Sequence, residues 1–178
     1  MNIEIAKSFQ LANNYDGRDP VGMLMQEKFN GVRAHLMGDL VFSRNGNLFS
    51  NLPILLDANS PWLDVELYLG VGTLGKLSGL LHRKVATTDD WAGLRVIAFD
   101  VLRCGGTYAE RLNHLGTFGF KRITIIQSIE CLSREHMNMF YGEVLARGGE
   151  GIMLKDPMAL YTPGYSSVMM KLKPGEGA

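Results

Sequence analysis

Short strand-like runs joined by very tight turns constrain the fold of this chain more than any other feature of its sequence. Residues 32–37 and 40–43 are two such runs, connected by Gly-Asp at positions 38–39, and Asn-Gly at positions 45–46 supplies a second tight turn. A two-residue connection reverses the chain and leaves the flanking runs side by side. This part of the chain is therefore predicted to form a β-meander.

The rest of the pattern adds more strands than helices. Residues 63–69 alternate aliphatic side chains with Asp64, Glu66 and Tyr68, which is typical of a half-buried strand and places Glu66 on its less apolar face. Further strands are predicted over residues 23–28, 94–102, 152–155 and 168–173. Helices are predicted over residues 74–84, 108–115 and, after the N-cap Ser133, up to Arg147, where Gly148-Gly149 stops the helix. The sequence predicts an α+β fold with mainly antiparallel sheets flanked by helices.

Composition and simple motifs narrow the functional classes. A chain of 178 residues, 46% of them hydrophobic, fits one domain over residues 1–178. Cys104 and Cys131 lie far apart without zinc-binding spacing, so we expect free thiols in a reducing compartment. No leader peptide or membrane-length apolar segment is visible, so we expect a soluble, cytoplasmic protein with no membrane partner. The full P-loop motif, GxxxxGK followed by Ser or Thr, is not present, so a P-loop is not supported.

Charged residues gather at or near the ends of the predicted strands, and together they match the needs of a nucleoside triphosphate. Cations neutralise phosphates, carboxylates hold a metal ion or a ribose hydroxyl, and an aromatic ring stacks on the base. A lysine flanked by other cations also loses its proton more readily and becomes a better nucleophile. The basic members are Lys28, Arg33, Arg44, Lys155, Lys171 and Lys173, and the acidic ones are Glu66 and Glu150.

Each of these residues also has an ordinary interpretation. Lys28 alone is a solvated lysine after a strand, and Phe99 alone is a core aromatic in an apolar run. The 18 basic and 18 acidic residues balance, which argues weakly against nucleic-acid binding, because a local basic face can be cancelled in the total. From the residues alone, lysine attack on a phosphoryl group is one reaction class among the alternatives.

Six short motifs, in order, resemble those of covalent nucleotidyltransferases. They cover residues 27–33 (EKFNGVR, similar to KxDG followed by Arg), 43–46 (SRNG), 64–67 (DVEL), 99–100 (FD), 150–155 (EGIMLK) and 171–173 (KLK). The series resembles the adenylation domain of ATP-dependent DNA ligases. Residues 15–20 (YDGRDP) and 109–112 (AERL) are most similar to minimal bacterial ligases of the Lig E type, with phage ligases next.

The resemblance implies a reaction and a set of roles. Lys28 would attack the α-phosphate of ATP with Mg²⁺ to give a covalent lysyl-AMP, which is then used to seal nicked duplex DNA. The implied catalytic residues are Lys28, Glu66, Glu150, Lys171 and Lys173, with Glu66 and Glu150 also serving the metal. The implied nucleotide-binding residues are Gln26, Glu27, Asn30, Gly31, Arg33, Arg44, Phe99, Ile152, Met153 and Lys155.

Within this set, the backbone at residues 26–27 would read adenine, and Phe99 would stack on it opposite Ile152 or Met153. Glu66 would contact the ribose. Arg33 and Arg44 would contact the nucleotide or the nick phosphate, while the three lysines of the last two motifs would neutralise phosphates.

Three departures from the family pattern shape the alternatives. Asn30 replaces an Asp, Tyr165 stands where many relatives carry Arg, and the chain stops where relatives continue into an OB-fold domain, so nick sealing is expected to be impaired. The alternatives are an RNA ligase or capping-type guanylyltransferase, separated by ATP against GTP preference, and a non-catalytic nucleotide- or nick-binding relative. NAD⁺ is not expected, because the additional N-terminal domain of NAD⁺-dependent ligases is not seen.

Overall fold

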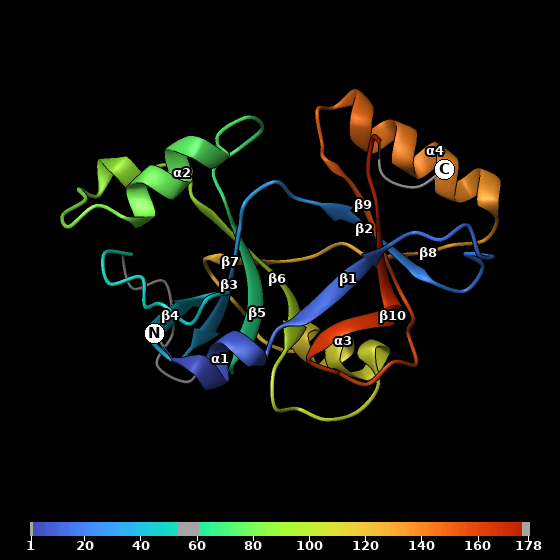
Figure 1. Ribbon diagram of the computed structural model, residues 1–178, viewed down its shortest axis with the longest axis horizontal. Coiled ribbons are helices and arrows are strands. Elements are labelled where there is room, and N and C mark those ends of the chain that lie inside the picture. The colour runs from blue at the N-terminus through green and yellow to red at the C-terminus, as the bar shows by residue number, and fades with distance from the viewer. Residues whose placement is uncertain (1, 53–60, 176–178) are drawn as a thin grey trace.

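Two five-stranded sheets form the protein, as the computed structural model shows for residues 2–52 and 61–175 (Figure 1). Sheet A has the strand order β1-β10-β9-β2-β8, and sheet B has the order β4-β3-β5-β6-β7. Most neighbouring strands are antiparallel, and the parallel pairs are β1 with β10 and β6 with β7. The predicted α+β fold with mainly antiparallel sheets is confirmed.

Sheet A is assembled from segments that are far apart in the chain. Its strands are β1 (Gln10–Asn14), β2 (Leu24–Lys28), β8 (Ile129–Glu130), β9 (Gly151–Lys155) and β10 (Gly164–Leu172). β9 pairs with β2 on one side and with β10 on the other, so the strand that ends in Lys28 lies beside residues more than 100 positions later. The start and the end of the described chain therefore meet in one sheet.

Sheet B is built from one continuous stretch of the chain. Its strands are β3 (Val32–Met37), β4 (Leu40–Ser43), β5 (Leu63–Tyr68), β6 (Arg95–Val101) and β7 (Ile123–Ile125). The hairpin of β3 and β4 has Gly38 at φ 65°, in the left-handed region that a tight two-residue connection requires. The predicted meander is confirmed at the residues where it was expected.

At least one helix packs against each sheet (Figure 1). α2 (Leu74–Leu81) packs Leu77, Leu80 and Leu81 into a core with sheet B, and α4 (Arg134–Ala146) packs Met137 and Val144 into a core with sheet A. The other helical segments are α1 (Ile3–Lys7), the 3-10 helix η1 (Asp89–Trp91) and α3 (Tyr108–Gly116). Among the residues described, no helix has the length and apolar character needed to cross a bilayer.

The termini of α4 follow the sequence signals. The Ser133 side chain accepts a hydrogen bond from the His136 backbone, as an N-cap does. Gly148 has φ 82°, and the Gly149 N–H donates to the carbonyl of Val144, so the helix ends as predicted and the chain turns directly into β9. This turn places Glu150 immediately before β9, whose first residue, Gly151, pairs with Lys28 at the end of β2.

Residues 63–68 form the predicted strand β5, but the strand is buried on both faces, so the expectation that it is half-buried is wrong. Asp64 is fully buried and Tyr68 is 8% exposed, although both lie on the face of β5 that alternation assigned to solvent. One face of β5 packs into the core with α2, and the other points towards sheet A. The two cysteines are free, as expected, with Cys104 exposed and Cys131 buried.

Gly142 gives a direct test of α4. It is exposed in the middle of the helix, and a Cβ added there would meet no atom within 4 Å. Since glycine inside a helix is less favourable than alanine, Gly142→Ala is expected to raise the free energy of unfolding by about 0.5–1 kcal/mol in urea titrations.

Gly149→Ala is the matched control at the end of the same helix. Its Cβ would lie 2.5 Å from Val144 Cγ1 and 2.8 Å from the Val144 carbonyl oxygen, so this substitution is expected to destabilise the protein. Equal effects of the two substitutions would contradict this description of α4.

Candidate active site

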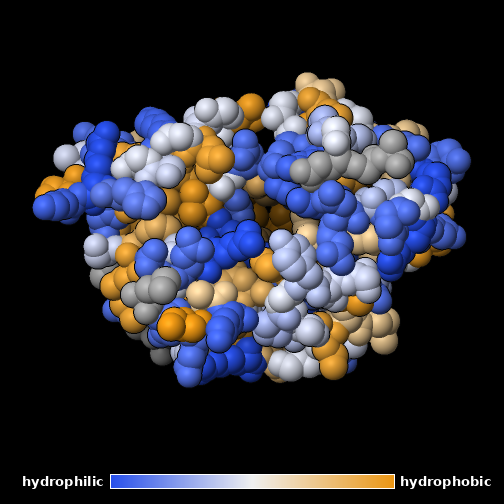
Figure 2. Space-filling view, in the orientation of Figure 1, coloured by the Kyte–Doolittle hydropathy of each residue, from blue (hydrophilic) through white to orange (hydrophobic). Residues whose placement is uncertain are grey.

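A cleft lies between the facing surfaces of the two sheets, and its volume is about 480 Å³, within the range of ligand sites. Figure 2 shows the molecule hollowed at its centre, between the halves that carry α2 and α4. The cleft is lined by Leu11, Ala12, Gln26, Glu27, Lys28, Phe29, Gly31, Val32, Arg33, Arg44, Glu66, Phe99, Ile126, Met153, Lys155, Tyr165 and Lys171. Most of the residues implied by the motifs are thus brought to one place.

Strand alternation and cross-strand register explain this convergence. Gln26 and Lys28 lie two residues apart on β2 and line the cleft, whereas Met25, the residue before Gln26, is buried in the core under α4. In the neighbouring strands Gln26 pairs with Met153, which in turn pairs with Lys171. On sheet B, Arg33 pairs with Glu66 in the same way.

Lys28 lies at one end of the cleft beside a carboxylate. Its Nζ is 2.5 Å from Glu150 Oε2, and Lys173 Nζ is 3.9 Å from Glu150 Oε1. The Lys28 and Glu150 side chains are each 23% exposed, so the pair remains open to a ligand. The closest charged partner of Lys28 is therefore an acid, where the sequence had suggested flanking cations.

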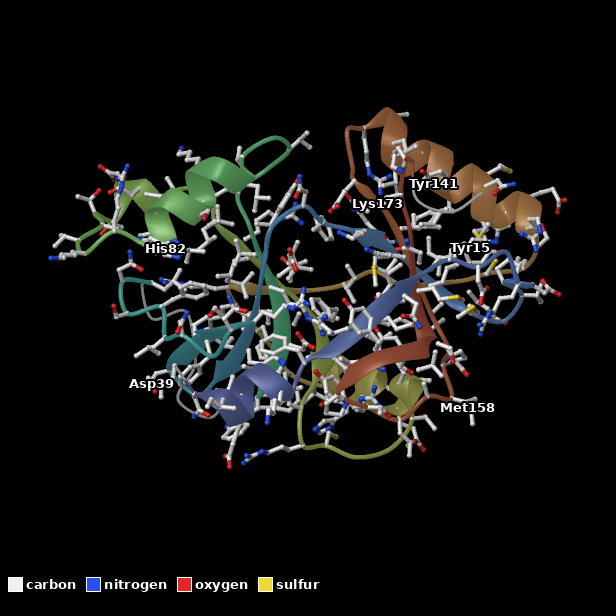
Figure 3. All side chains as sticks on the ribbon, viewed as in Figure 1. Tyr15, Asp39, His82, Tyr141, Met158 and Lys173 are labelled. Atoms are coloured by element: carbon white, nitrogen blue, oxygen red, sulfur yellow. The ribbon has the colours of Figure 1, made fainter. Side chains whose placement is uncertain are left out.

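Glu150 and Asn30 line a small pocket of about 70 Å³ that adjoins the cleft and shares Lys28 with it. Lys173 lies on the same side of the molecule as α4 (Figure 3). Side chains from both sheets fill the space between the two sheets. Glu150, Asn30 and Lys173 thus lie near Lys28 but do not line the main cleft.

Glu66 faces Lys28 from sheet B and is largely withdrawn from water. Burial raises the pKa of its carboxyl to about 7, against the opposing effect of the Arg33 and Lys28 charges. The Gly31 N–H donates to Glu66 Oε1 at 3.0 Å. A Cβ on Gly31 would lie 2.1 Å from the carbonyl oxygen of Leu67, so only glycine permits this approach of the turn after Lys28 to β5.

Aromatic and cationic side chains alternate at the other end of the cleft. Phe99 is half-buried, with Arg33 Cζ 5.2 Å and Lys155 Nζ 5.0 Å from the centre of its ring. Lys155 also lies 4.2 Å from the ring centre of Tyr108. Burial lowers the pKa of Lys155 to about 8, so the protein holds this cation in a poorly hydrated place.

Met153 and Ile152 were both candidates for the apolar side chain opposite Phe99, and they point in opposite directions. Met153 lines the cleft, while Ile152 is fully buried in the core under α4. Adjacent residues of a strand alternate between its two faces, so one of the two had to lie in the core.

Arg33 is held by a buried network that the sequence did not reveal. Its Nε and Nη2 donate to Asp64 at 2.9 and 2.5 Å, and its Nη1 donates to the carbonyl of Gln10 at 2.6 Å. Tyr161 Oη donates to the same Asp64 carboxylate at 2.9 Å. Burial alone would raise the pKa of Asp64, but Arg33 holds it well below its ordinary value. The sequence signal that could have indicated this network was an aspartate in β5, on the face opposite the aliphatic residues of the strand.

Several other residues of the cleft were also missed or lie at its edge. Arg44 is exposed at the rim, and Glu27 is tied to Arg147, with 2.7 Å between Glu27 Oε2 and Arg147 Nη2. Tyr165, 71% exposed, lines the cleft together with Leu11 from the neighbouring strand β1. An apolar wall residue such as Leu11 carries no sequence signal that separates it from an ordinary core or surface residue.

The carboxylates are compatible with a magnesium ion that is held mainly by a ligand. Among the residues that the structure describes, no group of three or more His, Cys, Asp or Glu side chains is placed to hold a metal ion. Mg²⁺ commonly binds through one or two carboxylates plus substrate phosphates, however, and Glu66 and Glu150 lie on either side of Lys28.

Comparisons of the sequence and of the structure with known proteins all lead to the same family. Residues 4–173 match the family model of the ATP dependent DNA ligase domain. A DNA ligase of Haemophilus influenzae is 29% identical over 184 residues, covering 97% of this chain and 68% of that protein. A solved structure from a structure-function analysis of Lig E DNA ligases is 27% identical, with a TM-score of 0.82 over 93% of this chain and 68% of that one. The ATP-dependent DNA ligase of bacteriophage T7, in complex with ATP, shares the fold, with 20% identity and a TM-score of 0.79 over 97% of this chain and 70% of that one.

The raised pKa of Glu66 predicts a pH-dependent stability. Between about pH 4.5 and 7 the folded protein holds a proton that the unfolded chain has lost, so stability falls as pH rises through this range and is level above it. Glu66→Gln removes this pH-dependent loss of stability and keeps an oxygen that can accept the hydrogen bond from the Gly31 N–H. One pKa unit corresponds to about 1.4 kcal/mol. Between about pH 4.5 and 7, the free energy of unfolding of the variant is therefore expected to rise by on the order of 3 kcal/mol relative to that of the original protein.

Urea unfolding of both proteins at about pH 5 and about pH 8 measures this difference. Parallel pH profiles of the two proteins would show that Glu66 does not titrate in this range.

Proposed function

The chain belongs to the ATP-dependent DNA ligase domain family, and on that premise we propose that Lys28 is the residue that carries AMP during ligation. The domain is that of an ATP-using enzyme, and the relatives named above are DNA ligases rather than RNA ligases or capping enzymes. The observation that carries the proposal is the position of Lys28 Nζ at the end of the cleft, 2.5 Å from Glu150.

The first step is attack of the neutral Lys28 amine on the α-phosphorus of ATP. The Nζ–P bond forms, the bond from the α-phosphorus to the bridging oxygen breaks, and pyrophosphate leaves with the electron pair. The resting ammonium first loses one proton to water, and the second proton, released from the nitrogen as the Nζ–P bond forms, passes to Glu150, whose carboxylate oxygen is within hydrogen-bonding distance of Nζ. Glu150 thus serves first as the partner of the resting ammonium and then as the base.

The two walls of the cleft fit the two ends of a nucleotide. Phe99 and Met153 come from opposite sheets and suit the two faces of the adenine ring. Glu66 lines the same cleft close enough to interact electrostatically with Lys28, and its carboxyl can accept a hydrogen bond from a ribose hydroxyl. Arg33 donates through three nitrogens to Asp64 and Gln10, which favours a role in holding Phe99 over direct phosphate binding.

Cations at the other end suit the phosphates. Arg44 at the rim, Lys171 in the cleft and Lys173 beside Glu150 provide positive charge around Lys28. Mg²⁺, held by Glu150 or Glu66 and the phosphates, would offset the charge that develops on the leaving pyrophosphate. We include nicked duplex DNA as the acceptor: AMP passes to the 5′-phosphate of the nick, and the 3′-hydroxyl displaces it.

Labelling with ATP tests the role of Lys28 directly. With Mg²⁺ and ATP labelled at the α-phosphate, the protein is expected to retain label after denaturation, and Lys28→Arg is expected to retain less than about 1% of that amount, because arginine keeps the charge but is not a nucleophile. Lys76→Arg, an exposed lysine substitution in α2, is the matched control and should label normally. The protein is first treated with pyrophosphate to remove any AMP already bound.

The chemistry of the linkage gives a second criterion. A phosphoramidate is released by acid and survives base, whereas an ester to a hydroxyl side chain survives acid. Base-labile label, or label that persists in Lys28→Arg, would show that AMP is carried elsewhere. Transfer of label to nicked DNA is then measured separately from its attachment to the protein.

A further inference from the structure

We propose that Phe9 is a positioning residue for nucleotide binding: its ring steadies the Arg33 guanidinium that supports Phe99, the side chain assigned above to one face of adenine. The inference rests on the proposed function, because it concerns the wall of the cleft that would receive the base. Phe9 belongs to none of the six motifs and is not among the residues that line the cleft. Its effect on a nucleotide must therefore pass through Arg33 and Phe99.

Phe9 is buried in surroundings that differ from those of an ordinary core aromatic. The side chain is 2% exposed, yet it is in none of the three clusters of packed apolar side chains found among residues 2–52 and 61–175. Instead the His35 ring stacks on it, with ring centres 3.5 Å apart and 12° between the ring planes, and Arg33 Cζ lies 5.5 Å from its ring centre. The face of an aromatic ring attracts a cation, and the attraction is stronger where water is excluded. Phe9 therefore provides a contact to Arg33 that an aliphatic side chain would not provide.

Arg33 connects the two phenyl rings. Its Cζ is 5.2 Å from the ring centre of Phe99 and 5.5 Å from that of Phe9, so both contacts are within cation–π range. Asp64 accepts from Nε and Nη2, and the Gln10 carbonyl accepts from Nη1. These hydrogen bonds fix the edges of the planar guanidinium, whereas its contacts with the rings restrict its tilt. Without the Phe9 ring the guanidinium is free to tilt, and Phe99 loses a fixed support.

The backbone around Phe9 is anchored to the same network. Phe9 lies where the chain leaves α1 and enters β1 of sheet A (Figure 1). Its carbonyl accepts from the Gly164 N–H at 2.9 Å, and the N–H of Gln10 donates to Tyr161 Oη at 3.2 Å. Tyr161 in turn donates to Asp64, which holds the guanidinium. The ring and the cation that it supports are thus fixed relative to each other.

His35 keeps the Phe9 ring in place. Ser8 Oγ donates to the Ile5 carbonyl at 2.7 Å, so it has no hydrogen left for His35 Nδ1, 3.2 Å away, and must accept from that nitrogen. His35 is fully buried, and its Nε2 lies 3.4 Å from Tyr161 Oη. The imidazole therefore has a partner at each ring nitrogen and presents a fixed surface to Phe9.

Exchange of the ring for an aliphatic side chain tests the proposal. Phe9→Leu keeps an apolar side chain but removes the aromatic face, so KM for ATP in adduct formation is expected to rise about 10-fold, with kcat changed by less than about twofold. Phe49→Leu, the same change in the apolar core with α2, is the matched control and should leave KM unchanged. Both substitutions shorten a buried aromatic side chain and should lower the free energy of unfolding, so reduced stability alone cannot explain an effect confined to Phe9→Leu. An unchanged KM in Phe9→Leu would overturn the proposal.

Ser8→Ala is a milder variant that removes only the acceptor of His35 Nδ1. It is expected to raise KM for ATP about two- to threefold, because the imidazole then holds the Phe9 ring less firmly. If urea titrations show that Phe9→Leu does not fold, Ser8→Ala decides the matter, and an unchanged KM in that variant would contradict the role of Phe9.

Equilibrium binding distinguishes the base end of the cleft from the phosphate end. Lys28→Arg is not expected to react, so ATP affinity measured in that background reports binding alone. Adding Phe9→Leu should weaken the binding of ATP with Mg²⁺ about 10-fold and leave the binding of inorganic tripolyphosphate, which has no base, unchanged. Equal weakening of both ligands would show a general distortion of the cleft, and the proposal would then be wrong.

A double-mutant cycle tests whether the effect passes through Phe99. Phe99→Leu should itself weaken ATP binding, and adding Phe9→Leu should then weaken it no further. An equal loss with and without the Phe99 ring would rule out this route.

The roles of Phe9 and Lys28 can fail separately. If no protein–AMP adduct forms but ATP binding weakens in Phe9→Leu and not in Phe49→Leu, the role of Lys28 fails and that of Phe9 stands. If Lys28 carries AMP but ATP binds equally well to Phe9→Leu and to the original protein, the proposed function stands and this inference fails.

Discussion

The ion pair between Arg33 and Asp64 is the interaction on which the arrangement of the cleft depends. Asp64 is fully buried on β5 and accepts from Arg33 on β3 and from Tyr161 in the segment before β10, while Arg33 also reaches the backbone of β1. A buried charge without a partner is strongly destabilising, so these contacts must form together. They join sheet B to the edge of sheet A at the base of the cleft and leave Phe99 resting against the guanidinium. The polar faces of two sheets can oppose each other here because their charges are paired in this way.

The same pairing explains why overall charge says little about this protein. Lys28 is matched by Glu150, Arg33 by Asp64 and Arg111 by Asp100, so a cleft rich in cations coexists with a net charge of zero. What distinguishes the cleft is the environment of each charge. Glu66 and Lys155 have pKa values displaced towards neutrality by burial, whereas Asp64 is held firmly ionised by its partner. Displaced and fixed charges occur a few residues apart on the same strand, β5.

Local sequence signals correctly predicted the elements whose limits are set by interactions between residues close in the chain. The β3–β4 hairpin and α4 were predicted at or near their observed limits, because turn and capping residues mark where these elements begin and end. β1 was missed because QLANN has little apolar character, and it is a strand because β10 pairs with it. The burial of Asp64 and Tyr68 was missed for a related reason, as it depends on a second sheet that no local pattern announces. The site followed the same division: ordered motifs named the charged residues, but the contacts of Phe9, Asp64 and Tyr161 arise only from the tertiary fold.

The topology of the two sheets has a consequence for how the chain acquires its structure during synthesis. All of sheet B lies between residues 32 and 125, so it can assemble while the ribosome is still making the rest. Sheet A cannot, because β1 and β2 must wait for β10 and β9, which come after residue 150. The early strands are thus left with unpaired edges until β9 and β10 have been made, and Lys28 cannot meet Glu150 before then. The nascent chain can therefore hold one wall of the cleft well before Lys28 has its partner on the other.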